Sequence, residues 1–273
     1  MAKELEATHK NLYHAISAAD FNAMVAALDE KIPSLTRPEV VVEMARIVAA
    51  VGDGHTNIYP TRDPKIGFRT LPVVFTYFGD QLYVRAVRPE QRALLGARVM
   101  RIGNLDARDA YAAACTMIGH ENEGGARYWA QYLLAMPEVL EALHITSSVD
   151  DVPLVLATTR GSVNVTLHPF AAAEIMTGDI STLFRPREGW VDARDPAGGA
   201  DPLWLRKIDE PFHFEHTSLN SPGDLLYVQL NIVNDGPNET LEHFARRLHD
   251  EIAATKPDKF AIDLRQNRGG TAR

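Results

Sequence analysis

The feature that most constrains the fold is a short segment near the C-terminus, Lys259 to Gly270, with the sequence KFAIDLRQNRGG. Its FAIDL portion is apolar except for Asp263, a pattern typical of a strand buried on both faces of a sheet. A polar turn follows and ends in Gly269 and Gly270. Adjacent glycines let backbone N–H groups converge on one point, which suits a phosphate, a carboxylate or a reacting oxyanion. We therefore expect a buried strand that opens into an anion-binding turn.

The preceding residues predict a strand, a helix and then this strand. An apolar run covers residues 224–233, a turn cluster follows, and apolar residues then repeat at helical spacing from Leu241 to Ile252. Such a unit forms a right-handed crossover between parallel strands. The Gly269–Gly270 turn is therefore expected at the carboxyl edge of the sheet, where open α/β sheets bind their ligands.

Length and composition exclude several classes of protein. With 273 residues and 45% hydrophobic content, the chain can bury a large core. Its net charge of -8 and its lack of a basic block argue against nucleic acid as a partner. The single cysteine, Cys115, permits no internal disulfide and no cysteine-based metal cluster. No apolar run reaches the length of a membrane span, no cofactor is indicated, and the oligomeric state stays open.

The pattern of elements divides the chain into four regions. Residues 1–60 are expected to form a helical N-terminal region, and residues 68–120 to form short strands around a helix. Residues 121–222 are helical and β-rich, with a long loop near residues 177–202. Residues 223–273 begin an α/β core. The strands of the second region suggest a small peptide-binding module, a pattern that many α+β units share.

Single elements within these regions can also be predicted. Helical spacing favours one helix from Leu5 to Ile16. A second helix is expected to bury Phe21 and Leu28, and a third is expected to begin at the capping box formed by Thr36 and Glu39. Residues 203–208 are interpreted as a short strand.

A tight turn with the sequence Gly52-Asp53-Gly54-His55-Thr56 follows the capped helix. Two glycines around an aspartate form a tight turn, and such a turn does not need a histidine for its packing. The turn places His55 at the end of a well-anchored helix. His55 is therefore a candidate functional residue. A surface loop histidine is the alternative interpretation, and the spacing leaves both open.

Other motifs narrow the chemistry. The chain contains no Gly-x-Gly-x-x-Gly, no phosphate loop, no His-Glu-x-x-His and no Gly-x-Ser-x-Gly motif. His213 and Glu215 share one face of a predicted strand and offer two metal ligands, but a third and a fourth are not evident. No metal site is therefore predicted.

Three stretches of the chain together resemble the S41 family of serine peptidases, which includes the tail-specific or C-terminal processing proteases and their tricorn-like relatives. They are VGDGHT at residues 51–56, LGARVMRIGN at residues 95–104 and AIDLRQNRGG at residues 261–270. The resemblance implies a mixed α/β and α+β chain, with a helical N-terminal region, a PDZ-like segment and the start of a ClpP- or crotonase-like α/β core. It also suggests a periplasmic or secreted location, although the chain carries no signal peptide.

The resemblance also implies roles for individual residues. His55 matches the general base of the Ser-His branch, whereas the lysine-using branch does without this histidine. Gly269 and Gly270 match the oxyanion hole. The family's nucleophilic serine and its third catalytic residue lie downstream of this strand, and Gln266 and Arg268 replace residues that are usually small.

No serine follows Arg265, and the upstream serines have no recognisable nucleophile setting; they include Ser147, Ser148, Ser162 and Ser218. We therefore expect the chain to be the N-terminal part of a longer peptidase that acts on peptides or proteins, and to be catalytically incomplete as given.

Two other functions remain open. The PDZ-like segment can bind an extended peptide by strand addition, which would make the protein an adaptor or a pseudoenzyme. The Gly269–Gly270 turn can instead bind a phosphate group in a nucleotide-handling enzyme. This last interpretation is disfavoured because the glycines are not followed by the Lys-Ser or Lys-Thr pair of a phosphate loop, and no helix that could lend its dipole is expected after them.

Overall fold

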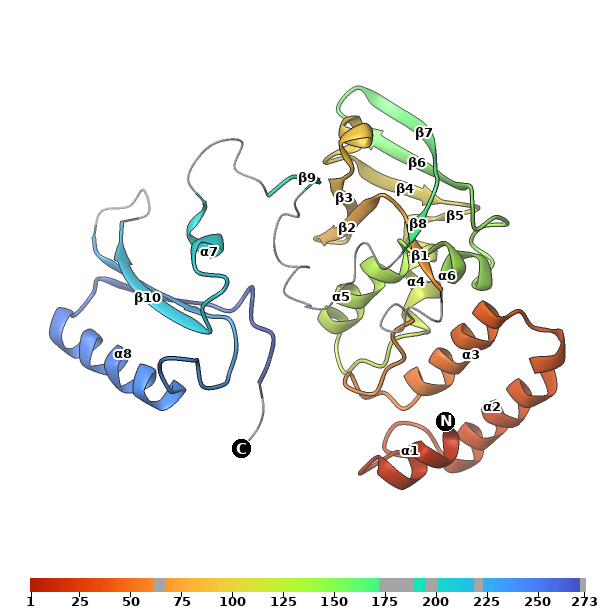
Figure 1. The fold of residues 1–273 in the computed structure, drawn as a ribbon, viewed down its shortest axis with the longest axis horizontal. Coiled ribbons are helices and arrows are strands. Elements are labelled where there is room, and N and C mark those ends of the chain that lie inside the picture. Colours follow the sequence, from red (N-terminus) through yellow and green to blue (C-terminus); the bar gives the residue numbers. More distant parts are fainter. Residues whose placement is uncertain (61–66, 172–188, 195–200, 219–222, 271–273) are drawn as a thin grey trace. The chain divides into compact units, whose positions relative to one another are not determined.

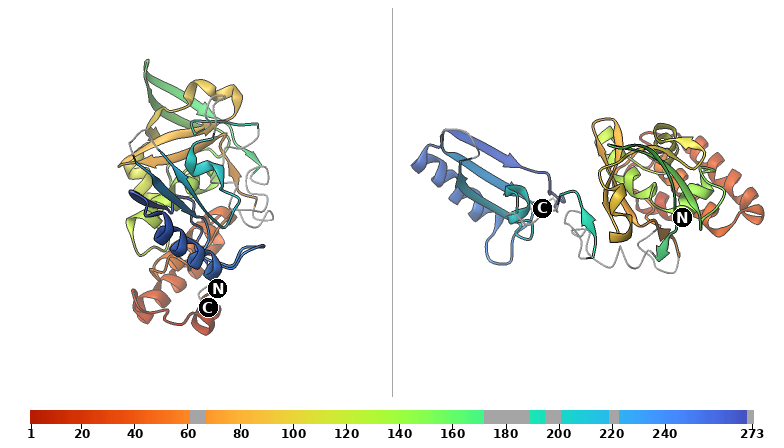
Figure 2. Two further views of the ribbon diagram at one scale, coloured as in Figure 1. Left: turned by 90° about the vertical axis from the view of Figure 1, so that its left-hand side faces the viewer. Right: turned by 90° about the horizontal axis from the view of Figure 1, so that it is seen from above.

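The chain folds into two compact units, and each is described separately (Figures 1 and 2). Unit 1 contains Met1–Thr182 and Pro186–Arg194, and unit 2 contains Leu183–Arg185 and Asp195–Arg273. The computed structural model describes residues 1–60, 67–171, 189–194, 201–218 and 223–270. The structure is 37% helical and 25% strand, which confirms the predicted mixed class. None of the helices in these ranges is long and apolar enough to cross a membrane.

Unit 1 begins with a helical region in which α2 and α3 pack side by side (Figure 1). Its elements are α1 (Ala2–Thr8), α2 (Ala18–Lys31), the 3-10 helix η1 (Ile32–Ser34) and α3 (Arg37–Ala49). The capping box at the start of α3 is present, because Glu39 accepts the Thr36 N–H at 2.7 Å. Phe21 and Val51 are fully buried in the small core between these helices.

The prediction of one helix from Leu5 to Ile16 is wrong. The helix ends at Thr8, and His9 adopts an extended conformation. His9 instead places its Nε2 3.1 Å from a carboxylate oxygen of Asp53, a contact with a residue distant in sequence. Leu12 still reaches the small core, but it does so from a turn rather than from a helix.

A seven-stranded antiparallel sheet forms the larger part of unit 1. Its main path runs β2–β3–β4–β6–β7, with β5 beside β4 and β9 beside β3. The strands are β2 (Val73–Phe78), β3 (Gln81–Val87), β4 (Arg98–Ile102), β5 (Leu105–Asp106), β6 (Val152–Thr158), β7 (Gly161–Leu167) and β9 (Val191–Asp192). The other elements are β1 (Arg69–Thr70) paired with β8 (Phe170–Ala171), η2 (Pro89–Leu94), α4 (Ala107–Cys115), α5 (Glu123–Leu133) and α6 (Pro137–Ala142).

One continuous core lies between this sheet and helices α3 to α6. Phe75, Leu82 and Leu156 contribute buried strand residues, and Ala130 and Leu140 contribute buried helix residues. The sheet takes strands from both sides of residue 120, where the sequence suggested a boundary between regions. The PDZ-like character of residues 68–120 stays a prediction.

Unit 2 is a three-stranded sheet with one long helix on one face (Figure 1). Its elements are α7 (Leu203–Arg206), β10 (Phe212–Thr217), β11 (Leu225–Leu230), α8 (Leu241–Thr255) and β12 (Lys259–Asp263). Strand β10 is antiparallel to β11, whereas β11 and β12 are parallel, as the strand–helix–strand pattern predicts. The predicted strand at residues 203–208 is wrong: Pro202 caps a short helix whose Leu205 is buried.

The prediction that β12 is buried on both faces is also wrong. Phe260, Ile262 and Leu264 are 47%, 54% and 55% exposed. The reason is the position of α8, whose Phe244 packs against Phe212 and Val228 on the neighbouring strands. Most of the long loop predicted near residues 177–202 lies outside the described residues; within it, β9 pairs with β3.

Candidate functional site

Asp53 organises the turn that carries His55. Its carboxylate accepts the His55 backbone N–H at 2.9 Å and the Thr56 hydroxyl at 2.6 Å, and it lies 3.1 Å from His9 Nε2. The Thr56 and His55 hydrogen bonds lower the pKa of Asp53 from 3.8 to about 2. The turn therefore holds a carboxylate that is ionised at any pH near neutrality.

The His55 side chain projects from this turn into solvent. Its imidazole is 97% exposed, and its Nδ1 lies 3.7 Å from Asp53 Oδ1. This distance is longer than a hydrogen bond, so Asp53 bonds to the His55 backbone but does not direct its ring in this structure. A general base needs one ring nitrogen directed by an acceptor and the other facing the reacting proton. In this structure Asp53 lies near the ring without that hydrogen bond.

The turn is packed against a second segment of unit 1. The Gly54 N–H donates to Glu121 Oε1 at 3.0 Å, and Asn57 links the turn to the Gly119 N–H at 2.8 Å. A Cβ on Gly54 would lie 2.5 Å from Glu121 Oε2, and one on Gly119 would lie 2.4 Å from the Asp53 carbonyl oxygen. The Gly119 position therefore excludes a larger residue, because its neighbour is backbone, whereas a larger residue at Gly54 would displace the end of the Glu121 side chain. The sequence indicated the turn, but no local pattern indicated Gly119 or Glu121 as its partners.

Three side chains at this turn have the composition of a metal site. Asp53, His55 and Glu121 each offer one ligand atom, and these atoms lie within 4.8 Å of one another. The Asp53 carboxylate already has three hydrogen-bond partners, the His55 N–H, the Thr56 hydroxyl and His9, and Glu121 accepts one hydrogen bond. In contrast, His213 lies 3.6 Å from Glu215 Oε2, and no third ligand joins that pair within the described ranges.

The predicted oxyanion-hole glycines lie at the end of β12, in unit 2. Gly269 has a φ of +82°, which favours glycine, and its N–H donates to Asn267 Oδ1 at 2.9 Å. Gly270 bridges Val233 in parallel register, and a Cβ there would lie 2.0 Å from the Val233 carbonyl oxygen. Both positions thus require glycine for backbone reasons. The Gly269 N–H is occupied in this conformation, so binding an oxyanion requires it to leave Asn267.

His55 and the glycine turn belong to different units, so the structure describes each part of the predicted site separately.

The sheet next to the glycine turn carries a polar cluster that the sequence did not predict. Tyr227 donates its hydroxyl to Asp263 Oδ2 at 2.5 Å, and Arg265 pairs with the same carboxylate and stacks on Trp204. The hydrogen bonds from Arg265 and Tyr227 outweigh burial and lower the pKa of Asp263. The only sign of this cluster in the sequence is Asp263, a single charged residue within an apolar strand.

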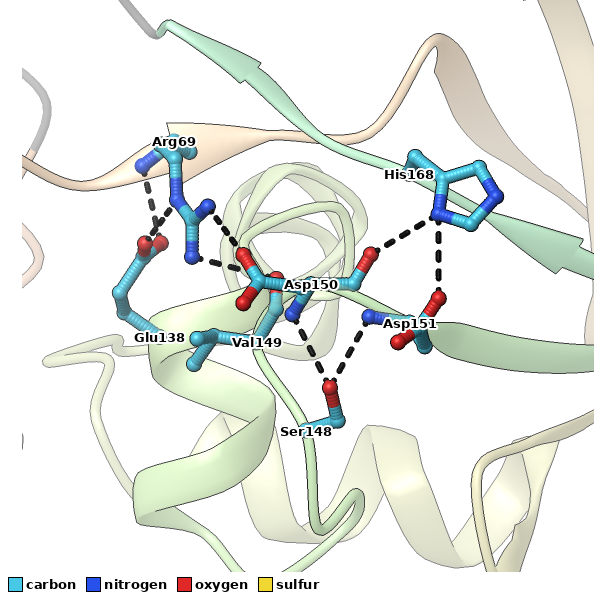
Figure 3. Close-up of polar contacts among 7 residues, drawn as sticks. All are labelled: Arg69, Glu138, Ser148, Val149, Asp150, Asp151 and His168. Atoms are coloured by element: carbon cyan, nitrogen blue, oxygen red, sulfur yellow. Dashed lines mark hydrogen bonds and ion pairs between the residues drawn. The ribbon is translucent and has the colours of Figure 1, made fainter.

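Ser148, Asp151 and His168 lie close together in unit 1 and have the composition of a catalytic triad (Figure 3). Their geometry differs from one. The Ser148 hydroxyl oxygen accepts the backbone N–H groups of Asp150 and Asp151 at 3.1 and 3.0 Å. His168 Nδ1 lies 3.2 Å from Asp151 Oδ1, and no hydrogen bond joins His168 to Ser148. Ser148 therefore stabilises a turn.

Figure 3 also shows a cluster of ion pairs that connects β1 with the turn containing Ser148 and Asp150. Arg69 Nε lies 2.7 Å from Glu138 Oε1, and Arg69 NH1 lies 2.7 Å from Asp150 Oδ1. Glu138 also accepts the Arg69 backbone N–H at 2.8 Å. The cluster connects three segments and has no free nucleophile, so its role is structural.

A groove lies between β4 and α4 in unit 1. Strand β4 pairs with β3 at a single position, Tyr83 with Arg98, so the two strands separate beyond it. The groove that opens there is lined on the strand side by Met100 and Arg101 and on the helix side by Arg108. Its walls combine apolar surface with charged side chains.

Comparisons with known proteins give the fold of the chain. No family model matches it, and no curated protein does. Eight chains of solved structures do match, among them the two that follow. The structure of mature CPAF aligns with 92% of this chain and 50% of its own, at 14% identity and a TM-score of 0.52. A serine-to-alanine mutant of CPAF aligns with 92% and 51%, at 12% identity and a TM-score of 0.56. CPAF is a chlamydial serine protease. The chain therefore has a fold similar to that of CPAF and spans about half the length of these structures.

Proposed function

We propose that this chain is the part of an S41-type serine peptidase that carries the general base and the oxyanion-binding turn. The observation that carries the proposal is the fully projecting side chain of His55 beside the ionised Asp53, within a fold similar to that of CPAF. The nucleophilic serine does not occur in a suitable setting in this sequence. The chain alone is therefore proposed to bind but not to hydrolyse peptides or unfolded protein segments.

The proposed chemistry assigns one step to each group. His55 Nε2 takes the proton of a serine hydroxyl as that oxygen attacks the scissile carbonyl, and it later protonates the leaving amine. Asp53 orients the ring through Nδ1 and stabilises the imidazolium, because its low pKa keeps it charged. The Gly269 N–H, once released from Asn267, and the Gly270 N–H stabilise the negative charge that develops on the carbonyl oxygen.

Labelling with a fluorophosphonate probe, which reacts with activated serines, tests this proposal. The chain as given should show no labelling and no hydrolysis of fluorescein-casein. A product extended along the coding DNA beyond the Arg273 codon should do both, and His55→Ala in that product should abolish hydrolysis without changing its circular dichroism. Labelling of the unextended chain would place the nucleophile at an upstream serine, and full activity of the His55→Ala product would remove His55 from the mechanism.

A second function is favoured by the groove between β4 and α4. A peptide lying in this groove would contact Met100, and Arg101 and Arg108 can bind acidic groups on that peptide. In this case the chain is a peptide-binding adaptor or a pseudoenzyme. Fluorescence anisotropy with a fluorescein-labelled acidic peptide should then show saturable binding that persists in His55→Ala and weakens at least several-fold in Arg101→Glu. Binding unaffected by Arg101→Glu would exclude this groove.

A further inference from the structure

Asp53, His55 and Glu121 bring one imidazole and two carboxylates together at the Gly52–Thr56 turn of unit 1. One ligand atom from each of these residues lies within 4.8 Å of the other two. Zinc bonds to imidazole nitrogen and to carboxylate oxygen at about 2.0–2.2 Å, so donor atoms around one tetrahedral zinc ion are about 3.3 Å apart. His55 Nδ1 and Asp53 Oδ1, at 3.7 Å, are already close to that separation.

Both carboxylates keep a lone pair for a metal ion. A carboxylate offers about four lone-pair directions, two on each oxygen. The Thr56 hydroxyl and His9 contact Asp53 Oδ2, and the His55 backbone N–H donates to Oδ1. These contacts leave one direction on Oδ1, the oxygen that lies 3.7 Å from the His55 ring. The Gly54 N–H donates to Glu121 Oε1 and leaves Oε2 for a further ligand.

The absence of a side chain on Gly54 makes room for the Glu121 carboxylate. A Cβ on Gly54 would lie 2.5 Å from Glu121 Oε2, so a larger residue there would displace this oxygen from the turn. The backbone near Glu121 packs closely against the turn: a Cβ on Gly119 would lie 2.4 Å from the Asp53 carbonyl oxygen. The side chains of His55 and Glu121 are exposed and can rotate to bring their donor atoms to the distances that a metal ion requires.

Asp53 also has the outer contacts that a metal ligand needs. Ligating carboxylates are themselves hydrogen-bonded by neighbouring groups, which fix their orientation and raise the affinity of the site. On Asp53, the Thr56 hydroxyl at 2.6 Å and His9 Nε2 at 3.1 Å have this role. Both contact Oδ2, so they hold the carboxylate while Oδ1 stays on the side of His55.

We propose that Asp53, His55 and Glu121 bind a zinc ion through Oδ1, Nδ1 and Oε2, with water in the fourth position. Three protein ligands and one water are the usual set of a zinc site that keeps an open position. One imidazole with two carboxylates favours zinc over calcium and magnesium, which prefer about six to eight oxygen ligands.

A zinc ion on Nδ1 would also control the chemistry of His55. With Nδ1 bound to zinc, the neutral ring carries its proton on Nε2 and has no lone pair left to accept the proton of a serine. The zinc-bound chain is thus the inactive form of the proposed peptidase, and removal of the ion restores the base. This consequence rests on the proposed function, whereas zinc binding itself does not.

Isothermal titration calorimetry of the untagged chain with zinc chloride tests the site. The tightest binding should have a stoichiometry of one, and calcium or magnesium chloride should give no saturable heat. Glu121→Gln keeps an acceptor for the Gly54 N–H but removes the carboxylate, so it should weaken zinc binding at least about tenfold, as should His55→Ala. His243→Gln is the matched control, because His243 is exposed and lies 2.7 Å from one carboxylate, that of Glu239; it should bind zinc as the wild type does. No binding, or equal affinity in Glu121→Gln and the wild type, would overturn the proposal.

A zinc titration of hydrolysis tests the consequence in the product extended beyond the Arg273 codon. Zinc should stop the hydrolysis of fluorescein-casein, and EDTA should restore it. In Glu121→Gln of that product, the zinc concentration that halves the variant's own zinc-free rate should rise by the same factor as its zinc dissociation constant. Zinc that binds without slowing hydrolysis would remove His55 from the mechanism but leave the metal site in place. A chain that does not bind zinc would overturn the metal site and leave the proposed function unaffected.

Discussion

Strands β6 and β12 have similar apolar sequences but opposite surroundings. In β6, Leu154 and Leu156 are 1% and 0% exposed because the strand lies between β4 and β7 above the core of unit 1. In β12, Phe260 and Ile262 are about half exposed because the strand ends its sheet and α8 packs elsewhere. The comparison shows that apolar content predicts a strand but not its burial. Burial depends on the elements that cover it.

Replacing one side chain of β6 and one of β12 with alanine should give the largest difference in stability between the two units. Leu156→Ala should lower the free energy of unfolding by about 3–4 kcal/mol, because it removes buried contacts and leaves a cavity. Ile262→Ala should change it by less than about 1 kcal/mol, because the side chain is already half in water. Urea unfolding followed by circular dichroism at dilute concentration measures both. Equal losses would show that β12 is covered in solution.

Removal of the Arg69 side chain should give the next largest effect. Glu138 is 9% exposed and pairs with Arg69, so Arg69→Ala leaves a mostly buried carboxylate with a single backbone donor. We expect a loss of about 2–3 kcal/mol in unit 1. Arg246→Ala in unit 2 is the control, because its pair with Glu242 is about three-quarters exposed and should contribute at most about 0.5 kcal/mol. A loss no larger than that of the control would contradict a structural role for the cluster.

Much of this architecture was predicted from the sequence. The predictions that are wrong concern features that depend on contacts between residues distant in the sequence. The capping box of Thr36 and Glu39 and the parallel pairing of β11 with β12 depend on local patterns, and both were predicted. The first helix was predicted too long because its end depends on the contact between His9 and Asp53, which no local pattern reveals.

The same limit applies to the candidate site. The glycines of its turn identified His55 as a candidate, but the packing of Gly119 and Glu121 against that turn depends on the tertiary fold. The occupied N–H of Gly269 likewise depends on a side chain, Asn267, whose conformation the sequence does not specify. The catalytic roles of His55, Gly269 and Gly270 stay predictions.

Acid should destabilise unit 1 through Asp53. Its pKa falls from 3.8 to about 2 on folding, so the carboxylate contributes stability that is present above pH 3.8 and is lost as the pH falls toward 2. The shift corresponds to about 2 kcal/mol. Asp53→Asn should therefore lower stability by about that amount at neutral pH and by much less at pH 2. Asp80→Asn is the control, because Asp80 is 90% exposed. A pH-independent difference between wild type and Asp53→Asn would contradict this assignment.

Alkali should have a smaller effect, and it should act on unit 2. His216 lies 2.7 Å from Asp224 Oδ2 and 3.0 Å from Glu251 Oε1, and hydrogen bonding to Asp224 raises its pKa above 6.5. A raised pKa contributes stability that is complete below pH 6.5 and is lost as the pH rises through the folded-state pKa. Since His216 is one-third exposed, the contribution should be about 1 kcal/mol or less. His216→Gln should remove this loss above pH 6.5, whereas His249→Gln, at an 82% exposed site, should retain it. If the stability of His216→Gln varied with pH as that of the wild type does, the two carboxylates would not stabilise the imidazolium of His216. The stability of unit 2, like that of unit 1, would then depend on pH only where its carboxylates titrate, in acid.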